Sequence, residues 1–168
     1  MNESAPDRTL SPWTGPLGGL VWRLSIELEV VDGGLRHAVF VEAKNLSLAP
    51  VALSDQPSVR ATVRDAAGRA LPSSVLPASG PCHPAQWAVI PRDGYVGIRI
   101  DAQLVGLPAR NHGEALLALG DRSWVVGAGS YLLELQVSFA VDAKGPANHW
   151  AGRMDFPPLA FSVTPDMP

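Results

Sequence analysis

The chain of 168 residues lacks several features that would assign it to a common class. Its one cysteine, Cys82, excludes an internal disulfide and therefore a disulfide scaffold. No stretch approaches the ~18 consecutive apolar residues of a membrane-spanning helix. Charged residues make up 17% of the chain, against about 25% in an average soluble protein. The formal net charge of −3 shows no excess of basic residues, so we expect no nucleic-acid partner.

A secretory signal is also missing from the beginning of the sequence. Residues 1–20 contain no apolar run and no positively charged region before one. If Met1 is the natural start, this pattern predicts a cytoplasmic protein with a reduced thiol.

The common catalytic motifs are absent too. The sequence contains no G-x-S-x-G, no P-loop and no H-E-x-x-H. Gly127-Ala-Gly129 precedes a predicted strand instead of a helix, so it cannot direct a helix N-terminus at phosphate. The carboxylates are scattered over turns and solvent-facing strand positions, namely Glu27, Glu29, Asp32, Asp65 and Asp142.

Cys82 and His83 invite comparison with a catalytic dyad. We interpret Cys82 as a loop thiol because prolines flank the pair. The alternative is a thiol activated by another histidine brought close by the fold. The histidines are isolated, without the close pairing of zinc or copper sites, so we predict no metal and no cofactor. These histidines are His37, His83, His112 and His149.

What the chain does contain is apolar and polar residues in strict alternation, the pattern of a half-buried strand. Residues 21–31 alternate Trp22, Leu24 and Ile26 with polar residues, and residues 35–45 set Val39, Val41 and Ala43 against Glu42 and Lys44. Asp32-Gly33-Gly34 lies between them and suits a tight turn. We predict a hairpin with Trp22 in the core and Glu42 on the solvent side.

Further strands are predicted from the same alternation and from short apolar runs between turns. Their ranges are a short edge strand after Pro50, then 58–65, 87–90, 96–105, 124–126, 131–141 and 159–163. Residues 114–119 are compatible with one helical turn. Residues 1–19 are expected to form an extended arm docked by Trp13, and residues 20–165 a single domain.

These seven to nine strands, with no amphipathic helix, predict an all-β protein. Alternation means that each sheet has one solvated face, which antiparallel sheets tolerate and parallel sheets do not. The predicted fold is an antiparallel two-sheet sandwich of the immunoglobulin or fibronectin-III type. A small closed barrel is the alternative.

Two local patterns resemble those of bacterial immunoglobulin-like sandwich modules. One is AKNLSLAPVAL followed by VRATVRDAAGRALP, in which a strand, a bend, an edge strand and a further strand end at an Asp-x-x-Gly turn. The other is GAGSYLLELQVSF, a glycine turn that opens into a Tyr-led strand. Both are similar to the intracellular proteinase inhibitor family of bacilli. The resemblance implies the sandwich fold and a protein-binding role, and it assigns no inhibitory residue.

The tryptophans near strand ends leave two interpretations open. They either close the ends of the sandwich or present exposed rings to a ligand. Three of them, Trp87, Trp124 and Trp150, are the candidate ligand contacts. Our main hypothesis is a non-enzymatic protein-binding or accessory module. An inhibitor of another protein is one form of this hypothesis. The alternatives are carbohydrate or small-ligand binding through these rings, and an enzyme whose loops assemble an active site.

Overall fold

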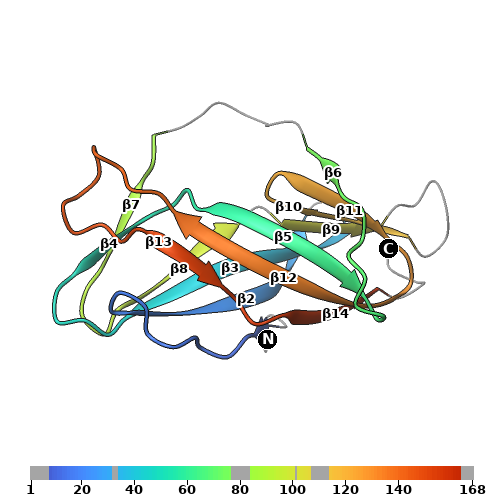
Figure 1. Cartoon of the computed structure of the whole chain (residues 1–168), viewed down its shortest axis with the longest axis horizontal. Helices are drawn as coiled ribbons and strands as arrows, with labels where there is room; N and C mark the ends of the chain where they lie inside the picture. The colour runs from blue at the N-terminus through green and yellow to red at the C-terminus, as the bar shows by residue number, and fades with distance from the viewer. Residues whose placement is uncertain (1–7, 32–33, 77–83, 101, 107–113, 164–168) are drawn as a thin grey trace, which may run out of the picture.

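The computed structural model describes residues 8–31, 34–76, 84–100, 102–106 and 114–163 (Figure 1). Within these ranges no residue is helical, and hence no helix is available to span a membrane. The predicted all-β class is confirmed. The strands are organised in four sheets, and the neighbouring strands within every sheet pair antiparallel.

One sheet has the order β1-β2-β3-β8 and lies at the back of Figure 1. Its strands are β1 (Arg8–Leu10), β2 (Leu20–Val31), β3 (Gly34–Asn45) and β8 (Tyr95–Ile100). A second sheet lies in front of it, with β12 at its centre, β5 on one side and β13 and β14 on the other. Its strands are β5 (Ser58–Asp65), β12 (Gly129–Phe139), β13 (Gly152–Asp155) and β14 (Leu159–Val163).

The two remaining sheets occupy opposite ends of the molecule (Figure 1). One has the order β6-β11-β10-β9, and the other is the pair β4-β7. Their strands are β6 (Ser74–Val75), β9 (Ala102–Gly106), β10 (Ala115–Leu119), β11 (Arg122–Val126), β4 (Val51–Ser54) and β7 (Trp87–Ile90). The described residues thus hold fourteen strands in four sheets, where the sequence predicted seven to nine strands in two.

The core lies between the front and back sheets. Trp22 of β2 is fully buried, as predicted, and its ring centroid lies 5.6 Å from that of Phe139 on β12. The ring of Trp150 completes this aromatic cluster at 4.8 Å from Trp22. On β12, Leu133, Leu135, Val137 and Phe139 are buried while the intervening residues are partly exposed. The apolar and polar residues alternate over 131–141, which predicts this facing, and the structure confirms it as far as Phe139. Val141 lies beyond β12 and is 80% exposed.

The predicted hairpin is confirmed, because β2 and β3 pair from Leu20–Asn45 to Val31–Gly34. The predicted turn residues Asp32 and Gly33 lie outside the described ranges. The short strand after Pro50 is confirmed as β4, which pairs with β7 and bridges to His149 at Ala52.

The prediction of one strand over residues 96–105 is wrong. The chain forms β8 in the back sheet and then β9 in a different sheet, where β9 pairs with β10. The alternation of apolar and polar residues continues through this stretch, so the sequence carries no mark of the change of partner. Sheet membership is decided by distant strands, which local periodicity does not record.

The suggestion of a helical turn at residues 114–119 is also wrong. Ala115–Leu119 is strand β10, paired on one side with β9 and on the other with β11. Ala115, Leu117 and Leu119 are buried and alternate with half-buried residues. Alanine and leucine favour helix in isolation, and pairing with two neighbouring strands overrides that preference here.

The solvent-facing position predicted for Glu42 is wrong as well. Its side chain is only 1% exposed and pairs with Arg8 and Arg23. Arg8 belongs to the predicted N-terminal arm, part of which forms β1 on the edge of β2. Trp13 of the same arm lies with its ring 4.3 Å from the Arg23 guanidinium. The arm is held on the back sheet by the β1–β2 pairing and by the Ser11 and Thr14 backbone bonds to β2, while Trp13 is 38% exposed. Arg8 covers Glu42, which the sequence pattern leaves open to solvent.

Candidate functional site

On the edge of strand β5 that faces away from β12, only some of the backbone groups are hydrogen-bonded to neighbouring segments. Its residues pair with β12 from Ser58–Ser138 to Asp65–Tyr131. In antiparallel pairs, hydrogen-bonded residue pairs alternate with pairs whose backbone groups point away from each other. Leu71 donates its N–H to the carbonyl oxygen of Val63, and Phe156 donates to that of Leu135. The backbone groups of Val59, Ala61 and Val63 therefore point away from β12.

This free side of β5 is closed at both ends and open in the middle. At one end, the Leu71–Val63 hydrogen bond of 2.8 Å joins β5 to the segment that follows it. At the other end Gly120 lies so close that a Cβ atom there would be 3.2 Å from the Val59 carbonyl oxygen. Between them, neither the N–H nor the C=O of Ala61 has a hydrogen-bond partner among the described residues. A strand edge of this kind is a template for another extended segment.

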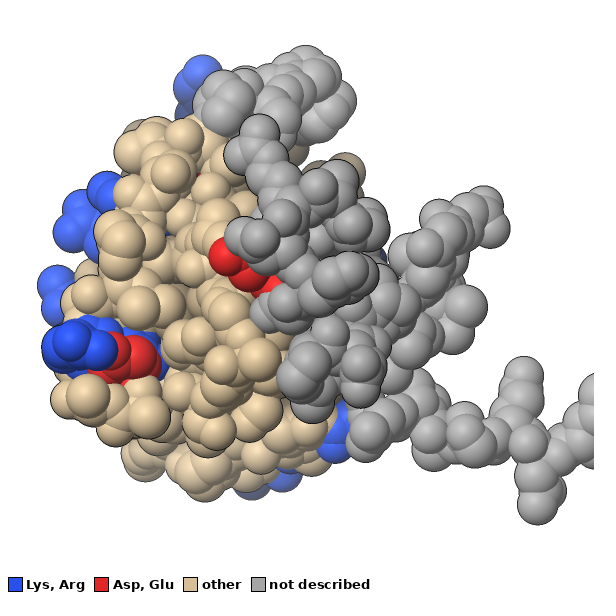
Figure 2. All heavy atoms as spheres, turned by 90° about the vertical axis from the view of Figure 1, so that its right-hand side faces the viewer, with Lys and Arg blue, Asp and Glu red and all other residues tan. Residues whose placement is uncertain are grey.

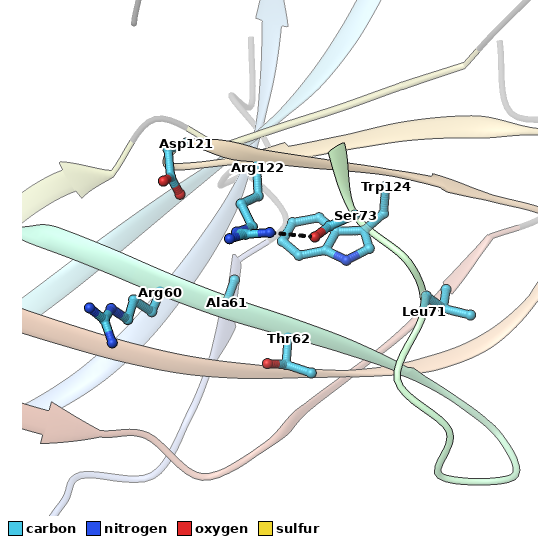
Figure 3. Close-up of a pocket in the computed structure, with 8 residues that line it drawn as sticks. All are labelled: Arg60, Ala61, Thr62, Leu71, Ser73, Asp121, Arg122 and Trp124. Atoms are coloured by element: carbon cyan, nitrogen blue, oxygen red, sulfur yellow. Dashed lines mark hydrogen bonds between the residues drawn. The ribbon is translucent and has the colours of Figure 1, made fainter. Parts of the chain in front are cut away.

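The opening widens into a cleft of about 470 Å³ between β5 and β11 (Figure 3). The segment after β5 closes one side of this β5–β11 cleft, because it leaves β5 at Leu71 and pairs with β11 at Ser74. Eight residues line the cleft: Arg60, Ala61, Thr62, Leu71, Ser73, Asp121, Arg122 and Trp124. The volume lies within the ~300–1,000 Å³ range of ligand pockets.

Arg60 connects the cleft with two neighbouring depressions, because its side chain lines all three. One depression, of about 1,080 Å³, extends from Asp55 to Arg99 and Arg153. The other, of about 490 Å³, lies over the outer face of β12 and β13. Arg60 is exposed and forms no ion pair with any described residue.

The charges in the β5–β11 cleft are two guanidinium groups and one carboxylate. Arg122 donates from Nη1 to the hydroxyl oxygen of Ser73, a neutral partner, at 3.0 Å, and it forms no ion pair with any described residue. Asp121 supplies the carboxylate, so the cleft carries a positive excess in a chain of net charge −3. On the outer face, the Glu134 carboxylate pairs with Arg64, with Oε1 and Nε 2.9 Å apart. This hydrogen bond raises the pKa of Arg64.

The end of the molecule at the right of Figure 1 carries few charged groups. Seen from that side, the described surface in view consists mainly of uncharged residues, with basic side chains around its margins and a few acidic groups (Figure 2).

The comparisons with known proteins add no relative. The chain has no significant match among protein-family models, curated proteins or solved structures. The functional interpretation therefore depends on the residues of this chain alone.

The three candidate tryptophans do not form a common surface. Trp124 is 2% exposed and Trp150 is 8% exposed, so neither offers a ring face to solvent. Trp150 belongs to the aromatic core beside Trp22, and Trp124 reaches the β5–β11 cleft from β11. Trp87 is half-buried and packs edge-on against His149 at 5.3 Å. The exposed aromatic platform expected for sugar binding is not assembled by these three rings.

His149 has a structural role in the loop that precedes Trp150. Its Nδ1 lies 2.6 Å from the Pro146 carbonyl oxygen, which can only accept, so Nδ1 carries the proton. Its Nε2 accepts from the Asp142 N–H at 3.3 Å. Cys82, His83 and His112 lie outside the described residues. Within the described ranges, no three histidine, cysteine or acidic residues are grouped as metal ligands.

Sequence reasoning did not single out Arg60, Ala61 or Arg122. The alternation over residues 58–65 places Arg60 in the polar row of its strand. This pattern is the only feature of the sequence that bears on the position of Arg60. Nothing in the sequence shows that β5 is an edge strand or that β11 lies across from it. Both facts come from pairings between distant segments.

Proposed function

We propose that this protein is a binding module that takes an extended segment of another protein along the open side of β5. One observation carries the proposal: the backbone N–H and C=O of Ala61 face the cleft without a partner among the described residues. An incoming strand placed there exchanges both hydrogen bonds with Ala61, as in β-strand addition.

The surroundings of Ala61 favour a polypeptide over a sugar. Leu71 and Trp124 line the same cleft and provide apolar contacts for a side chain that points inward. Sugar binding needs exposed ring faces, and the burial of Trp124 and Trp150 does not support it. We therefore propose a polypeptide ligand in preference to a sugar.

We also propose that the module is related to immunoglobulin-like or fibronectin-III-like sandwiches, including the intracellular proteinase inhibitors that its sequence resembles. The support is the facing of two antiparallel sheets across the aromatic core. The Tyr-led strand β12, which opens directly from a glycine turn, agrees with the resemblance.

The first test is amide hydrogen exchange of the full chain measured by NMR. We expect the Ala61 amide to exchange faster than those of Arg60 and Thr62, which face β12. Peptides selected from a displayed library of random extended sequences should then protect the Ala61 amide. If no selected peptide changes exchange at Ala61, the proposed function is wrong.

A pair of variants isolates the backbone contact. Ala61→Pro removes the donor that faces the cleft and leaves the ladder to β12 intact, since proline is tolerated where an edge N–H faces outward. Ala61→Val retains the N–H and adds similar bulk. We expect Ala61→Pro to weaken peptide binding by at least about fivefold relative to Ala61→Val, the effect of one hydrogen bond. Equal affinities would contradict backbone pairing at this site.

A further inference from the structure

We infer that the segment bound beside β5 carries carboxylate side chains that flank an apolar one. This inference rests on the proposed function and deepens it by giving the chemical class of the partner. It follows from the register of β5, from the charges in the β5–β11 cleft and from the lack of an ion-pair partner for Arg60 among the described residues.

The register of β5 determines which side chains a neighbouring strand meets. Val63 is buried and Ala61 partly so, while Arg60 is exposed on the opposite side of the strand. A residue paired with Ala61 therefore points in the same inward direction as Ala61, toward the cleft walls formed by Leu71 and Trp124. Its two neighbours in the added strand point outward, beside Arg60 and Thr62.

The charges favour acidic residues at those outward positions. Arg60 extends from β5 and Arg122 from β11, so guanidinium groups lie on both walls of the cleft (Figure 3). Asp121, beside Arg122, is the single carboxylate among the residues that line the cleft. Opposite charges on neighbouring strands stabilise pairing, whereas like charges oppose it. An outward lysine beside Arg60 would meet a like charge and is disfavoured, and Arg122 on the opposite wall adds a second positive charge to the cleft.

Arg60 also lines the wider depression on its other side. Arg99 and Arg153 line it together with Arg60, against Asp55 and Asp121. The Asp55 carboxylate accepts a hydrogen bond from the Gln86 N–H at 2.8 Å, a neutral donor that leaves its charge in place. Arg153 already pairs with Asp155 at 3.6 Å, so the preference for an acidic segment depends on Arg60 and on the β5–β11 cleft. An acidic extended segment of another protein is therefore the occupant that best fits the surface.

The test uses peptides from the selection described above and the intact protein. We expect the selected sequences to alternate, with Asp or Glu on both sides of an apolar residue. Replacing those acids by Gln, or changing Arg60→Glu in the protein, should each weaken binding about three- to tenfold by calorimetry. A peptide with Lys in place of the acids should regain affinity for the Arg60→Glu protein. Arg92→Glu, an exposed change outside the cleft, is the matched control.

The outcomes separate the inference from the function on which it rests. The selected peptides could bind Ala61→Pro more weakly than the wild type and yet bind Arg60→Glu as tightly as the wild type. That result would overturn the acidic preference and leave the proposed function intact. Absence of any selected peptide, or indifference to Ala61→Pro, would overturn both. Self-association that sedimentation velocity detects in the wild type and not in Ala61→Pro would assign the edge to a second copy of this chain, which also overturns both.

Discussion

Arg23 donates from Nε to Oε2 of Glu42 at 2.5 Å, across the β2–β3 pair, and Glu42 is almost completely removed from solvent. Arg8 of the N-terminal strand binds the other carboxylate oxygen. A buried carboxylate needs such partners because an unpaired charge inside a protein is strongly destabilising. The N-terminal segment is thereby joined electrostatically to the back sheet.

We expect Arg23→Met to lower the free energy of unfolding by about 3 kcal/mol, the lower end of the range for removing one partner of a buried charge. The lower end applies because Arg8 still neutralises Glu42. In a Glu42→Gln background, the same substitution should cost less than about 1 kcal/mol, as for an ordinary surface change. Denaturant unfolding of the four proteins measures this coupling, and additive losses would contradict it.

Two neighbouring positions on β12 test the facing of the front sheet. Leu135→Ala should lower the free energy of unfolding by about 2–5 kcal/mol, because it leaves a cavity in the core. Glu134→Ala should cost less than about 1 kcal/mol, since it removes only a half-exposed ion pair with Arg64. Chemical denaturation of both variants is the measurement. Equal losses would mean that β12 is buried on both faces.

The N-terminal arm can be tested with two glycines. Gly18 has a φ of +58°, and a Cβ atom there would lie 2.5 Å from Nε1 of the buried Trp150. We expect Gly18→Ala to destabilise the protein by about 1–3 kcal/mol, the cost of a strained left-handed residue. Gly15→Ala, where no atom lies within 4 Å of the added Cβ, should shift thermal unfolding far less. Equal shifts would show that residues 15–18 are not packed on the domain.

The turn after β5 gives the protein a specific pH dependence. The backbone N–H of Arg69 donates to the Asp65 carboxylate and, with the Arg69 side chain and the Ala67 N–H, lowers the pKa of Asp65. A lowered pKa in the folded state stabilises the protein above the unfolded value and loses that effect as pH falls through the folded value.

Asp65→Asn should therefore be less stable than the wild type at neutral pH. The difference should shrink as the pH falls below the ordinary aspartate pKa of 3.8. Unfolding curves of the two proteins at several pH values measure this convergence, and an NMR titration of Asp65 reports its pKa directly. A stability difference that does not change with pH would contradict the assignment.

Much of the local structure follows from the order of residues alone. The alternation around Trp22 and Leu135 predicts strands and the faces that they bury, because side chains along a strand point to opposite sides in turn. The Asp-x-x-Gly turn at Asp65 and the hairpin of β2 and β3 are equally local. Each depends on contacts between residues close in sequence or on a single repeating pattern.

The tertiary structure alone decided what lies beside each strand. Glu42 follows the polar alternation, and it is buried because Arg8 and Arg23 cover it from other strands. Residues 96–105 share one pattern, and they are divided between two sheets because β3 and β10 pair with different parts of them. The lack of a hydrogen-bond partner for the Ala61 backbone among the described residues has the same origin. An edge exists only where no distant strand arrives, and a pattern within β5 cannot report which distant strands those are.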